Sequence, residues 1–382
     1  MDMQSQESRS PMTGVHDDSA DPSARSQQYR PSTVESYLVR KVLIPAEQQQ
    51  HTHNMGSYSE PRLPSDLGFI GLGNMGFPMF SNLVSKLPPT TTVHFYDVNP
   101  DSVERGLKES GAVAKLDACN SSREVAEKSD VLISMVPEGK HVCAVYLHPE
   151  TGVLAANDLS GKILIDSSTI DTATSLEVGE ETKKRHPRAS FFDAPVSGGT
   201  TGAKKGSITF MIGCAESDPH LPLLKHLMSL MGHNIYTCGG PSLGLTAKFC
   251  NNYLSSSITL LNAEMFNFAI KSGMDPRTLQ EILKTTTGCN RNAQWANPVP
   301  GLSPDAPSSK NYKPGFKIEY VKKDIGLAIA ACERVGAKLC LGPTTWNSYV
   351  EAGQDPKCAG MDSKVIYRWI GGDEEWQEKF SD

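Results

Sequence analysis

The sequence lacks three features that would point to whole classes of function. It has no apolar run near the roughly 20 residues that a membrane-spanning helix needs, so we expect no membrane partner. It has no excess of basic residues, since the formal net charge is −6 and the pI is about 6.0, which argues against nucleic acid as a partner. Its nine cysteines form no C-x-x-C pair, which predicts reduced thiols and no metal site.

Residues 1–66 also lack the periodic apolar pattern and the aromatic content of a folded segment. Ser, Gln, Pro and His dominate there, so we predict a disordered N-terminal extension. It is a poor transit peptide because acids outnumber basic residues near its start (Asp2, Glu7, Asp17, Asp18 and Asp21 against Arg9 and Arg25). The remaining length predicts two domains.

A glycine-rich turn follows the first apolar strand. Residues 67–70 run into Gly71-x-Gly73-x-x-Gly76, and Asp97 follows a second apolar run 21 residues later (97 − 76 = 21). This order and spacing are typical of a dinucleotide site, in which backbone N–H groups approach a pyrophosphate at a helix N-terminus. The predicted cofactor-binding residues are Gly71, Gly73, Asn74, Met75, Gly76 and Asp97. The alternative is an ordinary tight turn with a surface aspartate.

The acid also bears on which dinucleotide binds. A carboxylate at position 97 would repel a 2′-phosphate, and no Arg or Lys follows in Asp97-Val98-Asn99-Pro100. We therefore predict NAD rather than NADP as the cofactor.

Residues 67–239 alternate short apolar strands with helical stretches, which predicts an α/β, Rossmann-type domain with a sheet that is parallel at its start. The predicted strands are Leu67–Gly71, Val93–Tyr96, Val131–Val136, Ile163–Asp166, Phe191–Asp193, Ile208–Ile212 and Asn234–Tyr236. Residues 240–382 instead predict an all-helical domain, to which the family resemblance described below assigns substrate binding and dimerisation. Its expected helices are Ser242–Gly273, Pro276–Thr285, Phe316–Gly336 and Pro343–Ala352.

The first of these helices joins the two domains. Ser242 is a candidate N-cap and Gly273 a candidate C-terminal stop. Apolar residues recur along it at helical spacing and predict one amphipathic face (Ala247, Leu254, Ile258, Leu261, Met265 and Phe268).

Five ordered motifs make the chain resemble the β-hydroxyacid dehydrogenase family. They are Gly68-Phe-Ile-Gly-Leu-Gly-Asn-Met-Gly76, Asp166-Ser-Ser-Thr-Ile170, Asp193-Ala-Pro-Val-Ser-Gly-Gly199, Gly206-Ser-Ile-Thr-Phe-Met-Ile-Gly213 and Lys248-Phe-Cys-Asn-Asn252. Within that family the chain is most similar to the 3-hydroxyisobutyrate dehydrogenases, because it carries Asn297-Pro-Val-Pro-Gly301 and Asn311-Tyr-x-x-Gly-Phe316.

Lys248 and Asn252 are one helical turn apart and therefore share a face. Oxidising a hydroxyl requires a base for its proton and a donor for the oxygen that becomes a carbonyl. A lysine can be that base if burial and a neighbouring cation lower its pKa. The resemblance assigns the catalytic role to Lys248, with Asn252 beside it. The alternative is a solvated helix lysine with a polar neighbour.

The resemblance also implies the binding residues. Ser197, Gly198 and Gly199 would hold the substrate carboxylate, through a hydroxyl and backbone N–H groups that glycines leave accessible; the alternative is a flexible turn. Further cofactor contacts fall on Val136, Pro137, His141, Thr169 and Lys323. For His141 the alternative is a polar helix cap, and for Lys323 a solvated charge pair with Asp324.

Three functions stay open. The first is NAD-dependent oxidation of a small β-hydroxy acid, with 3-hydroxyisobutyrate going to methylmalonate semialdehyde in valine breakdown. The second is a sister reductase of tartronate or succinate semialdehyde, and the third a non-catalytic dinucleotide-binding module. Lys248 and the lack of a basic arm in residues 1–66 argue against the third. We expect a homodimer or homotetramer, mitochondrial by resemblance or cytoplasmic because of the poor transit peptide.

Overall fold

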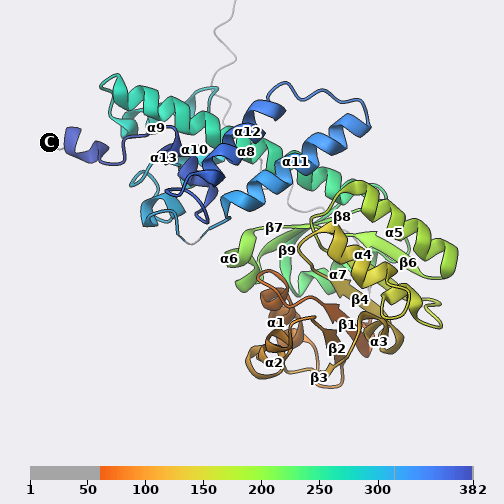
Figure 1. The fold of residues 1–382 in the computed structure, drawn as a ribbon. Helices are drawn as coiled ribbons and strands as arrows, with labels where there is room; N and C mark the ends of the chain where they lie inside the picture. Colours follow the sequence, from red (N-terminus) through yellow and green to blue (C-terminus); the bar gives the residue numbers. More distant parts are fainter. Residues whose placement is uncertain (1–60, 314, 381–382) are drawn as a thin grey trace, which may run out of the picture. The chain divides into compact units, whose positions relative to one another are not determined.

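The computed structural model describes residues 61–313 and 315–380 (Figure 1). The predicted N-terminal extension lies outside the described residues except for positions 61–66. In that short stretch Leu63 packs against the core of the first sheet, and the Ser65 carbonyl accepts a hydrogen bond from the Thr92 N–H at 2.7 Å.

The first sheet has six parallel strands in the order β3-β2-β1-β4-β5-β6. The strands are β1 (Asp66–Ile70), β2 (Thr92–Tyr96), β3 (Lys115–Ala118), β4 (Val131–Ser134), β5 (Ile163–Asp166) and β6 (Ser190–Asp193). The intervening helices are α1 (Gly76–Lys86), α2 (Pro100–Glu109), α3 (Ser122–Lys128), α4 (Gly139–Leu147) and α5 (Thr172–Arg185), with a short 3₁₀ turn at Val153–Ala155. This confirms the predicted Rossmann-type α/β architecture.

The order of the strands decides where ligands can bind. The chain leaves β1 toward β2 on one side and returns to β4 on the other, so the strand order reverses beside β1. In such sheets the crevice lies beyond the carboxyl ends of the strands at the reversal. Register places Ile70 opposite both Tyr96 and Ser134, so three strands end together at this edge.

A second sheet of three strands follows. The pattern of apolar strands in the sequence does not distinguish this sheet from the first. The second sheet holds β7 (Val196–Ser197) antiparallel to β8 (Ile208–Ile212) and β8 parallel to β9 (Gly232–Thr237), with α6 (Gly199–Lys204) and α7 (Leu221–Ser229) between them. β8 matches its prediction at both ends, whereas β7 and β3 are not predicted. β3 is half-exposed and lacks an apolar run, which is why periodicity does not find it.

After β9 the described chain is helical apart from one isolated bridge between Lys317 and Asp362. The helices are α8 (Leu243–Lys271), α9 (Pro276–Thr285), α10 (Arg291–Trp295), α11 (Ile318–Arg334), α12 (Gly342–Gln354) and α13 (Ile366–Trp369), with 3₁₀ turns at Pro307–Lys310, Ser363–Val365 and Trp376–Lys379. α8 contacts β6 and β8 near its start and α9 to α13 further along (Figure 1). Among the described residues, no helix combines the length and the apolar character needed to cross a membrane.

Both ends of α8 are fixed by specific residues. Ser242 occupies the N-cap position, but its side chain caps nothing, so that part of the prediction is wrong. The Asp193 carboxylate does the capping from the end of β6: it accepts the Ser242 N–H at 2.7 Å and the Leu245 N–H at 2.9 Å. At the other end Gly273 has a positive φ of 86°, and the Met274 N–H donates to the Ala269 carbonyl, as expected for a glycine stop.

The predicted apolar face of α8 does not face the core. Leu254, Leu261, Met265 and Phe268 are 58%, 45%, 53% and 66% exposed. The buried side of the helix is instead formed by other residues, among them Leu260, Ala263, Phe266 and Ile270. α8 is therefore apolar on both sides, and the period of the pattern alone does not tell which side is inside.

Candidate functional site

The glycine turn leaves room for an anion at the start of α1. Gly71 has a φ of 94°, and a Cβ there would lie 2.3 Å from the Met135 carbonyl oxygen, so only glycine fits. A Cβ at Gly73 would meet nothing within 4 Å. The first turn of α1 contains no acid and no side-chain cap. Its Phe77 N–H donates to the Gly73 carbonyl at 3.0 Å and Pro78 has no N–H, so the N–H groups that could face an anion are those of the glycine turn just before Phe77. Asn74 and Met75 lie in this turn, and the residues present fit a pyrophosphate.

Asp97 lies at the end of β2 and already holds the turn. Its Oδ2 accepts the Leu72 N–H at 2.6 Å and its Oδ1 accepts the Asn99 N–H at 2.8 Å. An open hollow of about 410 Å³ adjoins it, lined by Tyr96, Val98, Pro100, Val103, Glu104, Leu107, Cys119 and Asn120 besides Asp97 itself. The carboxylate thus stands between the glycine turn and a space where an adenosine could lie.

A buried carboxyl group holds the loops that follow β4 and β5. Asp166, at the end of β5, accepts hydrogen bonds from the hydroxyls of Ser134 and Ser168, both at 2.7 Å. Ser168 also accepts the Val136 N–H at 2.9 Å, which fixes the start of the Val136-Pro137 turn. Burial of Asp166 away from any cation raises its pKa to about 6.

Lys323 of α11 reaches this same edge. Its ammonium donates to the Thr169 carbonyl at 2.8 Å and to the Pro137 carbonyl at 3.2 Å. The structure therefore brings together three of the predicted cofactor residues, from the loops after β4 and β5 and from α11. His141 lies in the first turn of α4, half-buried, and its Nδ1 has no hydrogen-bond partner among the described residues. The His141 ring therefore does not cap α4.

Lys248 is a buried lysine without a hydrogen-bond partner in the described part of the chain. The residue is 8% exposed, and burial is the largest effect on its ammonium group, lowering its pKa below the ordinary 10.5. The charge of Asp324 opposes that shift and the charge of Lys323 reinforces it. The alternative of a solvated helix lysine does not fit this burial.

Asn252 lies one turn further along α8 and is held by Asp324. Its Nδ2 donates to Asp324 Oδ2 at 2.6 Å, and Asp324 is 3% exposed. Asp324 Oδ1 lies 3.5 Å from the Lys323 ammonium. Because one acid faces the lysine, the asparagine and Lys323, these groups form a single charged cluster between α8 and α11.

Ser197, Gly198 and Gly199 form the turn between β7 and α6. Gly198 and Gly199 have positive φ values of 131° and 61°, and a Cβ at Gly199 would meet nothing within 4 Å. A residue other than glycine would be strained at both positions, and at Gly198 its Cβ would also lie 3.3 Å from the Ile208 side chain. No hydrogen bond between described residues links this turn directly to Lys248; the connection runs through Asp193, which precedes the turn and caps α8.

Family comparisons match both parts of this chain. Residues 66–240 match the "NAD binding domain of 6-phosphogluconate dehydrogenase", and residues 243–370 match "NAD-binding of NADP-dependent 3-hydroxyisobutyrate dehydrogenase". The "Probable 3-hydroxyisobutyrate dehydrogenase, mitochondrial" of Dictyostelium discoideum is 37% identical over 307 residues, which span 80% of this chain and 90% of that relative. The chain belongs to the 3-hydroxyisobutyrate dehydrogenase branch of the β-hydroxyacid dehydrogenase family.

Further relatives agree. The mitochondrial 3-hydroxyisobutyrate dehydrogenase of Mus musculus is 39% identical over 283 residues, 74% of this chain and 80% of the relative. A solved Mycobacterium tuberculosis 3-hydroxyisobutyrate dehydrogenase with L-serine has a TM-score of 0.71 and 32% identity, covering 81% of this chain and 99% of that one. The protein is therefore an NAD-binding oxidoreductase that acts on a CH–OH group of a small β-hydroxy acid.

Two site residues escape prediction from the sequence. Asp193 stands in a quoted motif, but nothing in the motif says that its carboxylate caps a helix 49 residues later. Asp324 is recognised only as a neighbour of Lys323, although it is buried. The sequence signal that could have revealed both residues is an acid at the end of an apolar strand or on an apolar helix face. A carboxylate at such a position is buried and therefore needs a hydrogen-bond or charge partner.

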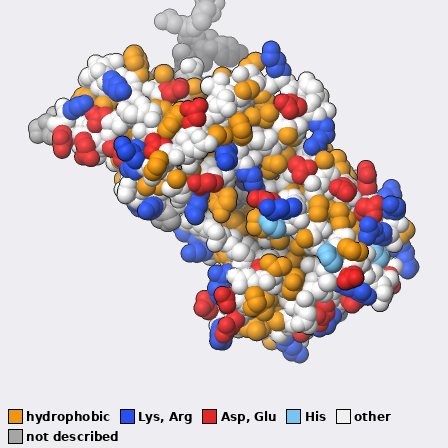
Figure 2. Space-filling model, in the orientation of Figure 1, with side chains coloured by type: hydrophobic (Ala, Val, Ile, Leu, Met, Phe, Trp, Pro, Cys, Tyr) orange, Lys and Arg blue, Asp and Glu red, His pale blue; other side chains and the backbone are white. Residues whose placement is uncertain are grey.

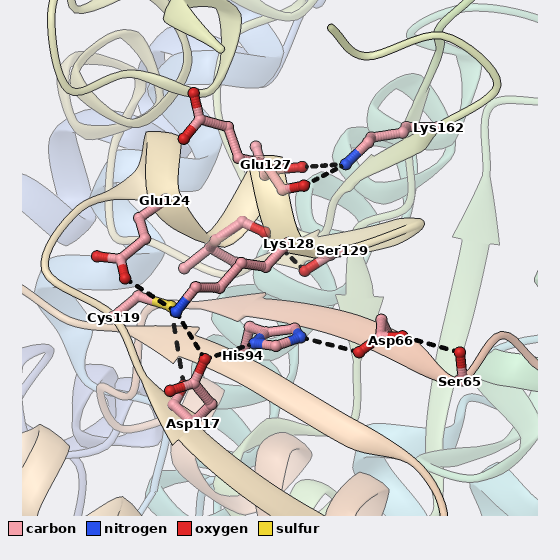
Figure 3. A network of polar contacts seen from close by, with 12 residues as sticks. Ser65, Asp66, His94, Asp117, Cys119, Glu124, Glu127, Lys128, Ser129 and Lys162 are labelled. Carbon is pink, nitrogen blue, oxygen red and sulfur yellow. Dashed lines mark hydrogen bonds and ion pairs between the residues drawn. The ribbon is translucent and has the colours of Figure 1, made fainter. Parts of the chain in front are cut away.

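A second polar cluster lies on the sheet face covered by α3 (Figure 3). His94 of β2 stands between two acids, 2.7 Å from Asp117 Oδ2 and 3.1 Å from Asp66 Oδ1. The ligand atoms of His94, Asp117 and Cys119 lie within 4.8 Å of one another, which would suit a metal ion. However, the Lys128 ammonium already pairs with Asp117 at 2.8 Å. The cluster therefore carries its own cation, and it ties β1, β2 and β3 together.

Charged side chains of both signs are interspersed over the face shown in Figure 2, without a continuous basic patch on that face.

Proposed function

We propose that the protein oxidises 3-hydroxyisobutyrate to methylmalonate semialdehyde with NAD, as a step of valine breakdown. The observation that carries the proposal is Lys248, buried and without a hydrogen-bond partner among the described residues, beside an asparagine held by a buried acid. NAD accepts a hydride when it is bound. The residues of the chain must then bind the hydroxy acid, orient it and take its hydroxyl proton.

Lys248 takes the hydroxyl proton in its neutral form. Burial favours that form because it disfavours the ammonium ion. The negative charge of Asp324 acts in the opposite direction and raises the pKa of Lys248. With burial and Asp324 opposing each other, Lys248 can both accept a proton and donate one. In the reverse direction the protonated lysine returns the proton to the oxygen.

Asn252 orients the reacting oxygen. One of its amide hydrogens is committed to Asp324, which fixes the plane of the amide. Its Oδ1 accepts from Asn251 Nδ2 at 3.0 Å, so the second amide hydrogen is left for the substrate oxygen. The turn Ser197-Gly198-Gly199 would hold the carboxylate through its hydroxyl and N–H groups.

The cofactor preference follows from Asp97. Its carboxylate accepts two backbone hydrogen bonds and carries negative charge where a 2′-phosphate would lie. We therefore propose NAD as the preferred form, although one matching family description names NADP-dependent enzymes.

Initial rates across a panel of substrates test this proposal. The hydroxy acids are 3-hydroxyisobutyrate, L-serine and other C3–C5 acids, each with NAD and NADP, and the semialdehydes of tartronate and succinate are tested in reduction. L-serine is included because the solved mycobacterial relative is complexed with it. We expect 3-hydroxyisobutyrate with NAD to give the highest kcat/KM. A tenfold higher value for either semialdehyde would make the sister reductase the correct function.

We also propose a mitochondrial location and a homo-oligomeric state. The curated relatives named above carry "mitochondrial" in their names, whereas the acids near the start of residues 1–66 argue for the cytoplasm. Import of the full chain into isolated mitochondria, with protection from added protease, separates the two compartments.

A further inference from the structure

Side chains hold both backbone polar groups of Leu72 in the glycine turn. Leu72 stands between Gly71 and Gly73 and is fully buried. Its N–H donates to Asp97 Oδ2 at 2.6 Å, and its carbonyl accepts from Arg105 Nη2 at 2.5 Å. The dinucleotide motif includes Asp97 but not Arg105, which follows it by eight residues in α2 (105 − 97 = 8). Arg105 is therefore a second support of the turn, and its position in the sequence gives no sign of it.

The local structure brings Arg105 to the turn. α2 begins directly after Asn99, whose N–H donates to Asp97 Oδ1 at 2.8 Å. The helix can lie close to the turn because position 106 is a glycine: a Cβ on Gly106 would lie 3.0 Å from Leu72 Cδ1. The hydrogen bonds thus close a ring that runs from Leu72 through Asp97 and α2 back to Leu72.

The guanidinium of Arg105 is fixed in place and keeps its charge beside the turn. Its central carbon lies 4.1 Å from the centre of the Phe77 ring, in the first turn of α1. Among residues 61–313 and 315–380 no carboxylate forms an ion pair with it, and the adjacent Glu104 pairs with Lys108 instead. Its buried Nε also has no hydrogen-bond partner there. The described contacts of the guanidinium are therefore with the turn and with the start of α1.

The bond to the Leu72 carbonyl decides which way the next N–H points. A peptide unit is planar and trans, so the Leu72 carbonyl and the Gly73 N–H point in opposite directions. Because Arg105 turns the carbonyl toward α2, the Gly73 N–H points away from α2. This N–H has no partner in the described part of the chain, and a Cβ on Gly73 would meet nothing within 4 Å. Without Arg105 the peptide could turn over, since glycine permits both orientations.

We propose that Arg105 is a cofactor-positioning residue, which holds the Leu72–Gly73 peptide so that the Gly73 N–H faces the pyrophosphate of NAD. Arg105 acts through the turn and contacts no reacting atom. Its loss should therefore weaken the binding of NAD and leave the chemical step intact. The proposal rests on NAD binding and not on which hydroxy acid is oxidised.

Calorimetric titration of the full chain with NAD, in the absence of any hydroxy acid, tests the proposal. Arg105→Met keeps an unbranched side chain against Phe77 but removes the donor, and its Kd for NAD should rise about tenfold. The loss should persist in about 0.5 M NaCl, because salt screens a bare charge but does not restore the orientation of a peptide. Arg105→Lys keeps a charge and a donor, so its Kd should stay within about threefold of the wild-type value. The matched control is Arg185→Met, which removes an exposed arginine paired with Glu181 on α5 and should bind NAD as the wild type does.

Steady-state kinetics separates positioning from a general loss of structure. In Arg105→Met the KM for NAD should rise about tenfold, while kcat at saturating NAD and the KM for the hydroxy acid change by less than about twofold. If the proposed reaction is wrong, the calorimetric results still decide the role of Arg105. The proposal is overturned if Arg105→Met binds NAD within about twofold of the wild type. It is also overturned if the loss disappears in high salt, if Arg105→Lys loses as much affinity as Arg105→Met, or if kcat falls as far as the affinity does.

Discussion

At the scale of single residues, the proposed mechanism depends on Lys248 as the base. Lys248→Ala should lower kcat by roughly 10²–10⁴-fold, the usual range for losing a general base. Lys248→Arg should fail nearly as badly, because a guanidinium stays protonated and cannot accept the proton. Binding of NAD, measured by calorimetry, should barely change in either variant. The control is Lys284→Ala, which removes an exposed helix lysine paired with Glu281 and should leave kcat unchanged.

The pH profile gives an independent test of the same residue. Because burial lowers the pKa of Lys248 below 10.5, kcat/KM for oxidation should rise with pH as the free-enzyme lysine loses its proton. It should level off below pH 10.5 rather than at it. If Lys248→Arg keeps most of its activity, the lysine is an electrostatic anchor, and His141, with its unpartnered buried Nδ1, is the first alternative base.

Asp97 should determine the cofactor preference. We expect NAD to be favoured over NADP by at least roughly tenfold in kcat/KM, about 1.4 kcal/mol. Asp97→Ser with Val98→Arg should shift the preference toward NADP. It should also weaken binding of both forms, since the Leu72 N–H loses its acceptor. A wild-type protein that uses NADP better would contradict this role of the acid.

At the scale of elements, the N-terminus of α8 should depend on Asp193. This carboxylate accepts two N–H groups of the helix that carries Lys248, and an asparagine amide cannot accept both. Asp193→Asn should cost about 1–3 kcal/mol of unfolding free energy and also lower kcat, by displacing the lysine. Asp275→Asn is the matched control at the N-cap of α9, because Asp275 accepts a single helix N–H there, that of Arg277, and an amide oxygen can still accept it. It should lower the melting temperature slightly and leave kcat unchanged; equal effects on kcat would show that Asp193 acts on stability alone.

Elements with a strong local pattern could be predicted closely, and others could not. α9 and β8 have the predicted ends, and α8 lies within one residue of them at its start and two at its end. β3 could not be predicted because its pairing with β2, rather than its own sequence, makes it a strand. The side of α8 that faces the core was also not predictable, because both sides are apolar and only the partners of each side distinguish them.

At the scale of the whole molecule, the parallel sheet explains why several of the predicted cofactor residues, although far apart in the sequence, lie together. Strands that run the same way end at one edge, so motifs far apart in the sequence meet there, as Pro137 and Thr169 do around Lys323. Contacts between the sheet and the helices do not follow from any strand rule. The pairs Asp193 with α8 and Asn252 with Asp324 join residues 49 and 72 positions apart, and only the packed structure reveals them.

The pH dependence of folding should show one of these buried acids directly. Burial raises the pKa of Asp166 from its ordinary value of 3.8 to about 6, so the native state binds this proton more tightly than the unfolded chain does. The contribution of Asp166 to stability is then fully present below pH 4 and is lost as the pH rises through about 6.

The free energy of unfolding of the wild-type protein minus that of Asp166→Asn should therefore fall by about 2–3 kcal/mol between pH 4 and pH 7, at about 1.4 kcal/mol per pKa unit. Urea unfolding at each pH measures the difference. Asp305→Asn, at a fully exposed acid, should give a difference that does not vary in this way. A difference that instead grows with pH would mean that the hydrogen bonds from Ser134 and Ser168 stabilise the Asp166 anion more than burial disfavours it.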